Sequence, residues 1–161
     1  MRIHLRERIL NPKTKPWPMA VLLSLCVLPW PSFAALGGDV ASLQADQVEM
    51  NATQEITAAA AYQVYELQTD TGVVVREYLS TAGVVFAVAW EGPVLPNLRQ
   101  LLGDYFTQYT EAAQSWRGGH GHMVIRQDDL VVESSGRMRA FFGRAYLPQE
   151  MPQGVAESDI Q

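Results

Sequence analysis

Apolar and polar residues alternate in the middle of the chain in a way that predicts three β-strands. These strands are expected at 62–68, 73–79 and 84–90, and Gly72 and Gly83 supply turn chemistry between them. The third run is almost entirely apolar, which is typical of a strand that is buried on both faces. The pattern therefore indicates an antiparallel three-stranded meander.

A helical period follows the meander. Residues 97–110 carry one apolar stripe at spacings of three and four, which predicts a single amphipathic helix. The stripe consists of Leu98, Leu101, Leu102, Tyr105, Phe106 and Tyr109. Gly103 lies inside this helix and should cost about 1 kcal/mol relative to alanine, which suggests a close approach to another backbone.

Strand patterns return at 122–126, 130–134 and 138–147, with a turn expected at 135–136, and a short helix is expected at 39–50. The order is then helix, three strands, helix, three strands. This order predicts an α+β fold of two antiparallel three-stranded meanders, with helices packed on one face of the sheet. Residues 35–147 form the predicted single domain. Residues 148–161 contain three acids and two prolines and are predicted to be a flexible acidic tail.

The amino-terminal residues have the three parts of a secretory signal. Five basic residues precede the uncharged apolar run 19–28, and Ser32-Phe33-Ala34 ends the segment with small residues at the positions that a signal peptidase recognises. Ten apolar residues make about 15 Å of helix, half of the hydrocarbon core, so a membrane anchor is disfavoured. We therefore predict a signal peptide at 1–34, cleavage between Ala34 and Ala35, no transmembrane span in the mature form, and a periplasmic or secreted location.

The composition after Ala34 excludes several classes of chemistry. Seven arginines face sixteen acids, a formal net charge of −9 compared with −5 for the whole chain, which disfavours nucleic acid as a partner. The only cysteine, Cys26, lies in the signal, so thiolate catalysis and cysteine metal sites are excluded. No lysine follows Lys15, which excludes Schiff-base chemistry and a P-loop lysine. No cofactor is predicted.

Several motifs resemble an exported proteobacterial family known as domain of unknown function family 2844. The motifs are Ala34-Ala-Leu-Gly37, Val75-Arg-Glu-Tyr78, the run GVVFAVAWEGP at 83–93, Leu101-Leu-Gly103 and the run MRAFFGRAYLP at 138–148. The resemblance spans essentially the whole chain after the signal. It implies export, a single domain and a bacterial source, and it implies no activity, cofactor or catalytic residue.

Two groups of side chains are candidates for a site. His120 and His122 could share a strand face and bind a metal with Asp128, but two imidazoles are an incomplete ligand set, and an exposed loop explains them as well. Arg137, Arg139 and Arg144 could clamp an anion. They could equally form ion pairs with the acids of the domain.

Two carboxylates, Glu66 and Glu77, could face each other across the first hairpin, although a solvated face of alternating charge explains them equally. No catalytic constellation emerges from the sequence. We therefore expect an exported, non-enzymatic accessory or binding domain of the bacterial cell envelope, with an envelope protein as the candidate partner. The alternative is a small periplasmic hydrolase or metal-binding protein that uses His120, His122 and nearby acids.

Overall fold

The computed structural model of the protein describes residues 35–118 and 121–161. The predicted signal peptide at 1–34, including Cys26, and the histidine at position 120 lie outside the described residues. The elements in chain order are α1 (Val40–Glu49), β1 (Thr53–Ala58), β2 (Tyr62–Gln68), β3 (Val74–Ser80), β4 (Val85–Gly92), α2 (Leu98–Leu102), the 3₁₀ turn η1 (Gly103–Tyr105), α3 (Phe106–Ser115), β5 (His122–Arg126), β6 (Val131–Arg137), β7 (Ala140–Tyr146) and the 3₁₀ turn η2 (Glu157–Asp159).

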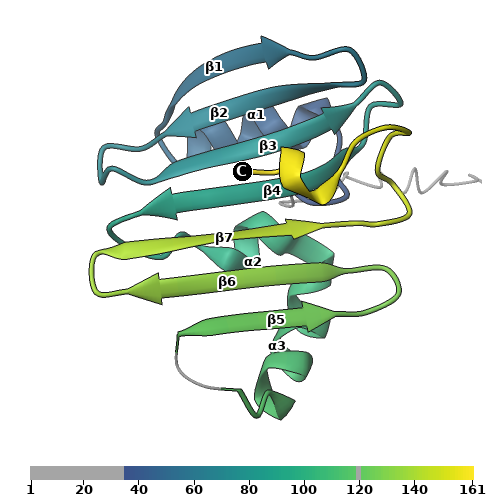
Figure 1. Ribbon diagram of the computed structural model, residues 1–161. Coiled ribbons are helices and arrows are strands. Elements are labelled where there is room, and N and C mark those ends of the chain that lie inside the picture. The colour runs from purple at the N-terminus through teal and green to yellow at the C-terminus, as the bar shows by residue number, and fades with distance from the viewer. Residues whose placement is uncertain (1–34, 119–120) are drawn as a thin grey trace, which may run out of the picture.

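The strands form one antiparallel sheet with the order β1-β2-β3-β4-β7-β6-β5 (Figure 1). This confirms the α+β class, but the strand arrangement differs from two meanders of three strands. The first group contains a fourth strand, β1, which pairs with β2 from Thr53 to Ala58. This strand is mostly exposed and lacks a strong apolar pattern, so pairing with its neighbour specifies it.

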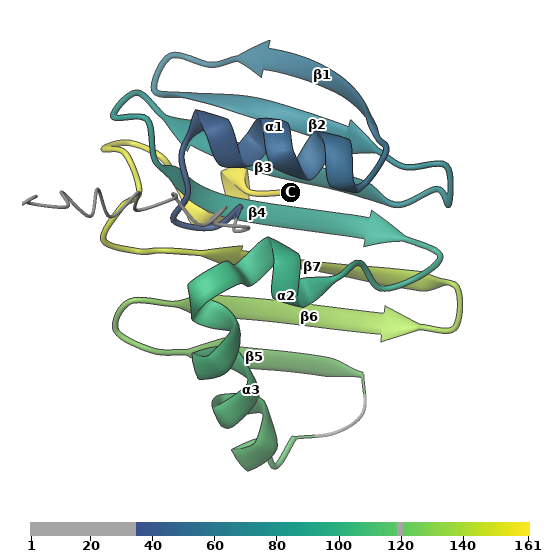
Figure 2. The ribbon, with the colours of Figure 1, turned by 180° about the vertical axis from the view of Figure 1, so that it is seen from behind.

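The helices cover one face of the sheet (Figure 2). Leu43 of α1 and Leu101 and Leu102 of α2 are fully buried against the sheet and form the main core with side chains such as Val75 and Val88. Asp39 and Asn97 begin α1 and α2 by accepting hydrogen bonds from the first free backbone N–H groups. An apolar stripe thus holds α2 to this side of the sheet, whereas α1 buries Leu43 together with the polar residues Ser42 and Asp46.

The predicted helix at 97–110 is interrupted. Gly103 has a φ of +51°, in the region that favours glycine, and it ends α2 before η1 and α3 begin. The break separates the stripe into two parts: Leu98, Leu101 and Leu102 are buried, whereas the aromatic residues beyond Gly103 are only half-buried. The glycine therefore redirects the chain, and the apolar period across it belongs to two helices.

The last hairpin turns at Met138 and Arg139, which corrects the turn expected at Ser135-Gly136. Gly136 continues β6 and pairs with Phe141 of β7. A Cβ at this position would lie 2.5 Å from Cδ1 of Phe141, so the aromatic ring occupies the space over the glycine. An aromatic ring over a glycine on the neighbouring strand is a known way to stabilise a sheet. Arg139 instead takes the turn, with a φ of +65°.

The predicted flexible tail at 148–161 is packed against the sheet face opposite the helices, which we call the helix-free face (Figure 1). Ile160 is buried in a second apolar cluster with Tyr78, Ala87, Ala89 and Tyr146. This segment covers the other side of β4, whose residues Val85–Trp90 are all buried. The sequence analysis judged the segment by its acids and prolines and did not identify Ile160 as an apolar anchor.

Candidate functional site

Two ionic clusters cross the helix-free face. In the first, Arg76 of β3 lies between two acids, with its Nε 2.7 Å from Oε2 of Glu66 and its Nη2 2.9 Å from Oε1 of Glu91. These acids come from the neighbouring strands β2 and β4, and Glu66 is the direct cross-strand partner of Arg76. The sheet register therefore positions the first cluster.

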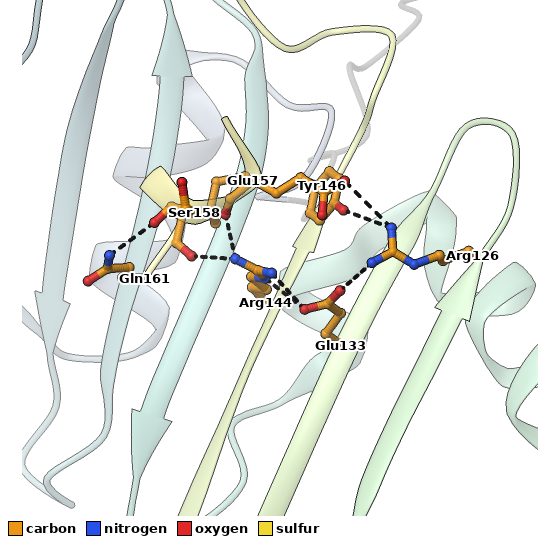
Figure 3. A network of polar contacts seen from close by, with 8 residues as sticks. Arg126, Glu133, Arg144, Tyr146, Glu157, Ser158 and Gln161 are labelled. Atoms are coloured by element: carbon orange, nitrogen blue, oxygen red, sulfur yellow. Dashed lines mark hydrogen bonds and ion pairs between the residues drawn. The ribbon is translucent and has the colours of Figure 1, made fainter. Parts of the chain in front are cut away.

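The second cluster has the opposite arrangement, with one acid between two arginines (Figure 3). Glu133 of β6 accepts hydrogen bonds at 2.8 Å from Nη2 of Arg126 and at 2.8 Å from Nη2 of Arg144. Arg144 is its direct partner on β7, and Arg126 comes from β5. Only about a quarter of the Arg144 side chain is exposed, so water screens this pair less than a typical surface pair.

Both clusters bind the main chain of the carboxyl-terminal segment. Arg144 Nη1 donates to the main-chain oxygens of Glu157 and Ile160, the latter at 3.2 Å. Arg76 Nη1 donates to the main-chain oxygen of Gln161 at 3.3 Å. The Tyr78 hydroxyl donates to the same oxygen at 2.9 Å and accepts from the Gln161 N–H at 2.9 Å. Residues 157–161 are thus held by donors that lie far away in sequence.

Ile160 is the apolar anchor of this contact. Its side chain is 1% exposed and lies over the small residues Ala87 and Ala89 of β4. Full burial of a side chain of this size contributes about 1.5–3 kcal/mol. The two alanines leave room for the Ile160 side chain on this face of β4.

A groove of about 350 Å³ adjoins Ile160 and Gln161 on the same face. Its lining includes Arg76 and Glu91 of the first cluster and Glu133 and Arg144 of the second. His122 of β5 and Ser135 of β6 also line it. Phe142 also lines the groove and is 56% exposed, an unusual exposure for a large aromatic side chain. The groove therefore combines an apolar contact surface with charged and polar groups.

Acid–base chemistry finds little support in this region. Burial raises the pKa of Tyr146 to about 12, and the hydrogen bond and negative charge of Glu157 add to the shift. The phenol therefore stays protonated at neutral pH. The same hydrogen bond lowers the pKa of the Glu157 carboxyl, which stays ionised. Ser135 lies opposite His122 in the sheet, but its hydroxyl donates to the main-chain oxygen of Gly121 at 2.6 Å.

The three arginines proposed from the sequence do not form one cluster. Arg144 is in the ion pairs described above, whereas Arg137 and Arg139 are exposed at the β6–β7 hairpin. The turn separates them: Arg137 pairs with Ala140, four residues from Arg144, or about 13 Å along the strand. Within residues 35–118 and 121–161, neither hairpin arginine forms an ion pair.

The proposed metal ligands are also separated. His122 begins β5, and Asp128 lies in the turn beyond the far end of that strand, so the strand length of about 13 Å lies between them. In the part of the chain that the structure describes, no group of three histidine, cysteine or acidic side chains is placed to hold a metal ion.

Comparison with known families places the chain. The family model described as protein of unknown function (DUF2844) matches residues 32–160. The chain belongs to this family. No curated protein and no solved structure matches it. Across the described ranges, the longest helices have ten residues, and none is long and apolar enough to cross a membrane.

This chain of the DUF2844 family also buries a pair of carboxyl groups that sequence reasoning missed. Asp46 of α1 and Glu77 of β3 are fully buried, and the largely buried Gln100 of α2 donates from Nε2 to Oδ1 of Asp46 at 2.7 Å. Glu77 pairs with Tyr65 in the sheet and therefore points to the helix side, whereas Glu66 pairs with Arg76 on the other face. The expected pairing of Glu66 with Glu77 is wrong. The sequence contained a signal for this burial: Glu77 alternates in step with Val75 and Leu79, whose side chains face the core.

Burial raises the pKa of Glu77 to about 9, and the negative charge of Asp46 adds to the shift. Burial also raises the pKa of Asp46, although the hydrogen bond from Gln100 opposes this. Both oxygens of Glu77 and Oδ2 of Asp46 lack a donor when the two groups are ionised. A proton on Glu77 supplies that donor, so the pair holds one proton and one negative charge.

Proposed function

We propose that the chain is an exported, non-enzymatic accessory or binding domain of the bacterial cell envelope, and that the groove on the helix-free face binds its partner. The observation that carries this proposal is the exposed Phe142 beside the paired Arg76 and Arg144. Aromatic and arginine side chains are the types most enriched at energetically important interface positions. Catalysis in the groove would require an activated nucleophile, acid or base, and the contacts described above for Ser135, Tyr146 and Glu157 provide none.

The alternative of a periplasmic hydrolase or metal-binding protein has weaker support. A serine nucleophile needs its hydroxyl hydrogen-bonded to a base that a third group orients. Ser135 donates instead to the Gly121 main chain, and among the described acids none hydrogen-bonds His122. His122 and Asp128, at opposite ends of β5, would need ligands from elsewhere to hold a metal ion.

Export is the part of the proposal that rests on sequence. The basic start, the short apolar run and the small residues before Ala35 support cleavage by a signal peptidase. The intact mass of protein recovered from a periplasmic extract should correspond to a chain that begins at Ala35. A full-length product found only in the cytoplasm would reject a periplasmic or secreted location.

Site-specific photo-crosslinking in living cells tests the binding surface. A photoreactive phenylalanine analogue placed at Phe142 should give a defined adduct with an envelope protein. The same analogue at Val48, which is 80% exposed on α1 and far from the groove in sequence and on the other side of the sheet, is the matched control. Equal crosslinking from both positions, or none from Phe142, would reject the groove as the partner-binding surface.

A further inference from the structure

The contact between residues 157–161 and the sheet has the form of a peptide–receptor contact. The donors Arg76, Tyr78 and Arg144 bind main-chain oxygens of residues 157, 160 and 161 and no side chain of them, and within residues 157–161 only the Ile160 side chain is fully buried. Peptide-binding surfaces commonly take affinity from main-chain hydrogen bonds and specificity from a pocket for one or a few side chains. The helix-free face provides both features.

The segment that leads from β7 to this contact has few anchors on the sheet. Met151 and Val155 pack half-buried on the second apolar cluster, whereas residues 153, 154 and 156–159 are exposed, and the segment after β7 adds no strand to the sheet. Its backbone bonds are local turns, such as the N–H of Val155 to the oxygen of Pro152 at 3.2 Å. Segments with few buried contacts and exposed hydrogen bonds open at much lower free energy than core strands.

We infer that the helix-free face is a peptide-recognition site, and that residues 157–161 occupy it as a resident ligand. The class of ligand is an extended peptide with a branched aliphatic side chain in the position of Ile160. The main-chain oxygen of the following residue binds Arg76 and Tyr78. An acid three positions before the aliphatic residue meets Arg126, as Glu157 does at 3.5 Å.

The adjoining groove gives a partner peptide an advantage over the resident segment. An intramolecular ligand competes at an effective concentration in the millimolar range, so a short copy of the segment cannot displace it efficiently. A longer peptide can also contact Phe142 in the groove next to Gln161. This inference names the kind of partner for the surface proposed above, and it rests on that proposal only for the partner's location in the envelope.

A labelled peptide of residues 156–161 tests the assignment by fluorescence anisotropy. The full chain with Ile160→Ala has a weakened resident segment and should bind this peptide at least about tenfold more tightly than the parent protein. The matched control is Ile56→Ala, which truncates an exposed isoleucine of β1 and should bind like the parent. A peptide with alanine in the position of Ile160 should bind none of the three proteins.

A folded Ile160→Ala variant that binds the peptide no better than the parent would overturn the inference. If that variant does not fold, hydrogen exchange of the parent protein provides an independent test. The amides of Ile160 and Gln161 should exchange at least about a hundredfold faster than those of β4. Exchange of both groups at one common rate would make the segment an integral part of the core and would also overturn the inference.

The two proposals fail separately. A crosslink from Phe142 to an envelope protein without peptide binding would keep the binding function and reject the resident-ligand assignment. Peptide binding without a crosslink would keep the recognition site and reject the envelope partner.

Discussion

Replacing Glu77 by glutamine should make the protein more stable at neutral and alkaline pH. Glu77 is fully buried beside Asp46, and burial together with that neighbouring charge raises its pKa to about 9. The folded protein must therefore keep a proton that the unfolded chain releases near its ordinary pKa of 4.5. Glutamine removes the titration and retains an N–H donor that can take the place of the carboxyl proton toward Asp46.

The sign and size of the effect follow from linkage. A group whose pKa is raised by folding contributes stability that is fully present below about pH 4.5 and is lost as the pH rises toward 9. Each pH unit in that window costs about 1.4 kcal/mol. At pH 7 the free energy of unfolding of the parent should be about 3 kcal/mol lower because of the Glu77 proton, a loss that Glu77→Gln avoids. Near pH 4.5 the two proteins should have similar free energies of unfolding.

Urea unfolding at pH 5, 6, 7 and 8 measures this difference. The free energy of unfolding of the parent should fall with pH, while that of Glu77→Gln should fall less steeply, because only the buried Asp46 carboxyl of this pair is left to lose a proton. Glu55→Gln, which removes an exposed acid from β1, is the control and should follow the parent. A parent whose stability does not change between pH 5 and pH 8, or a Glu77→Gln variant with the parent's slope, would refute a protonated Glu77.

Three further changes test the packing and the candidate metal ligands. Leu102→Ala should lower the free energy of unfolding by about 2–5 kcal/mol because the side chain is fully buried, whereas Val48→Ala on an exposed site should change it by under half a kcal/mol. Gly143→Ala should cost about 1–3 kcal/mol in the same assay, because its Cβ would lie 2.6 Å from a main-chain oxygen of β6; an unchanged midpoint would mean that the strands can separate there. Replacing His120 and His122 with alanine should leave the melting temperature unchanged with or without zinc, and a zinc-dependent rise in the parent that the double variant loses would support the metal site instead.

Particular strands show how far periodicity predicts this fold. The ranges of β2 and β5 agree with their sequence patterns, because alternation reports directly which side chains face a core. The sequence pattern did not predict β1, because its residues are mostly exposed and the strand depends on pairing with β2. The run Val85–Trp90 contained a further signal: a strand that is apolar on both faces needs a cover on both, and the helices supply only one. Residues 148–161 supply the other.

The candidate site was predictable only in part. The sequence identified Arg137, Arg139 and Arg144 as a candidate group of cations. Which of them pairs with an acid depends on how the strands are aligned in the sheet. Arg144 meets Glu133 because the β6–β7 hairpin turns at Met138 and Arg139, and the turn expected at 135–136 would have given these two strands another register. Arg76 and Tyr78 acquire their role from a segment some eighty residues away in sequence.

The sequence by itself determined the α+β class, most element positions, the acidic and cysteine-free composition after Ala34, and the expectation of export. These properties follow from local periodicity and composition, which each short segment carries on its own. The tertiary structure alone decided the strand order, the burial of Glu77 beside Asp46, and the docking of Ile160 over β4. Each of these depends on contacts between residues distant in the chain, where register and packing, rather than local propensity, decide which side chains meet.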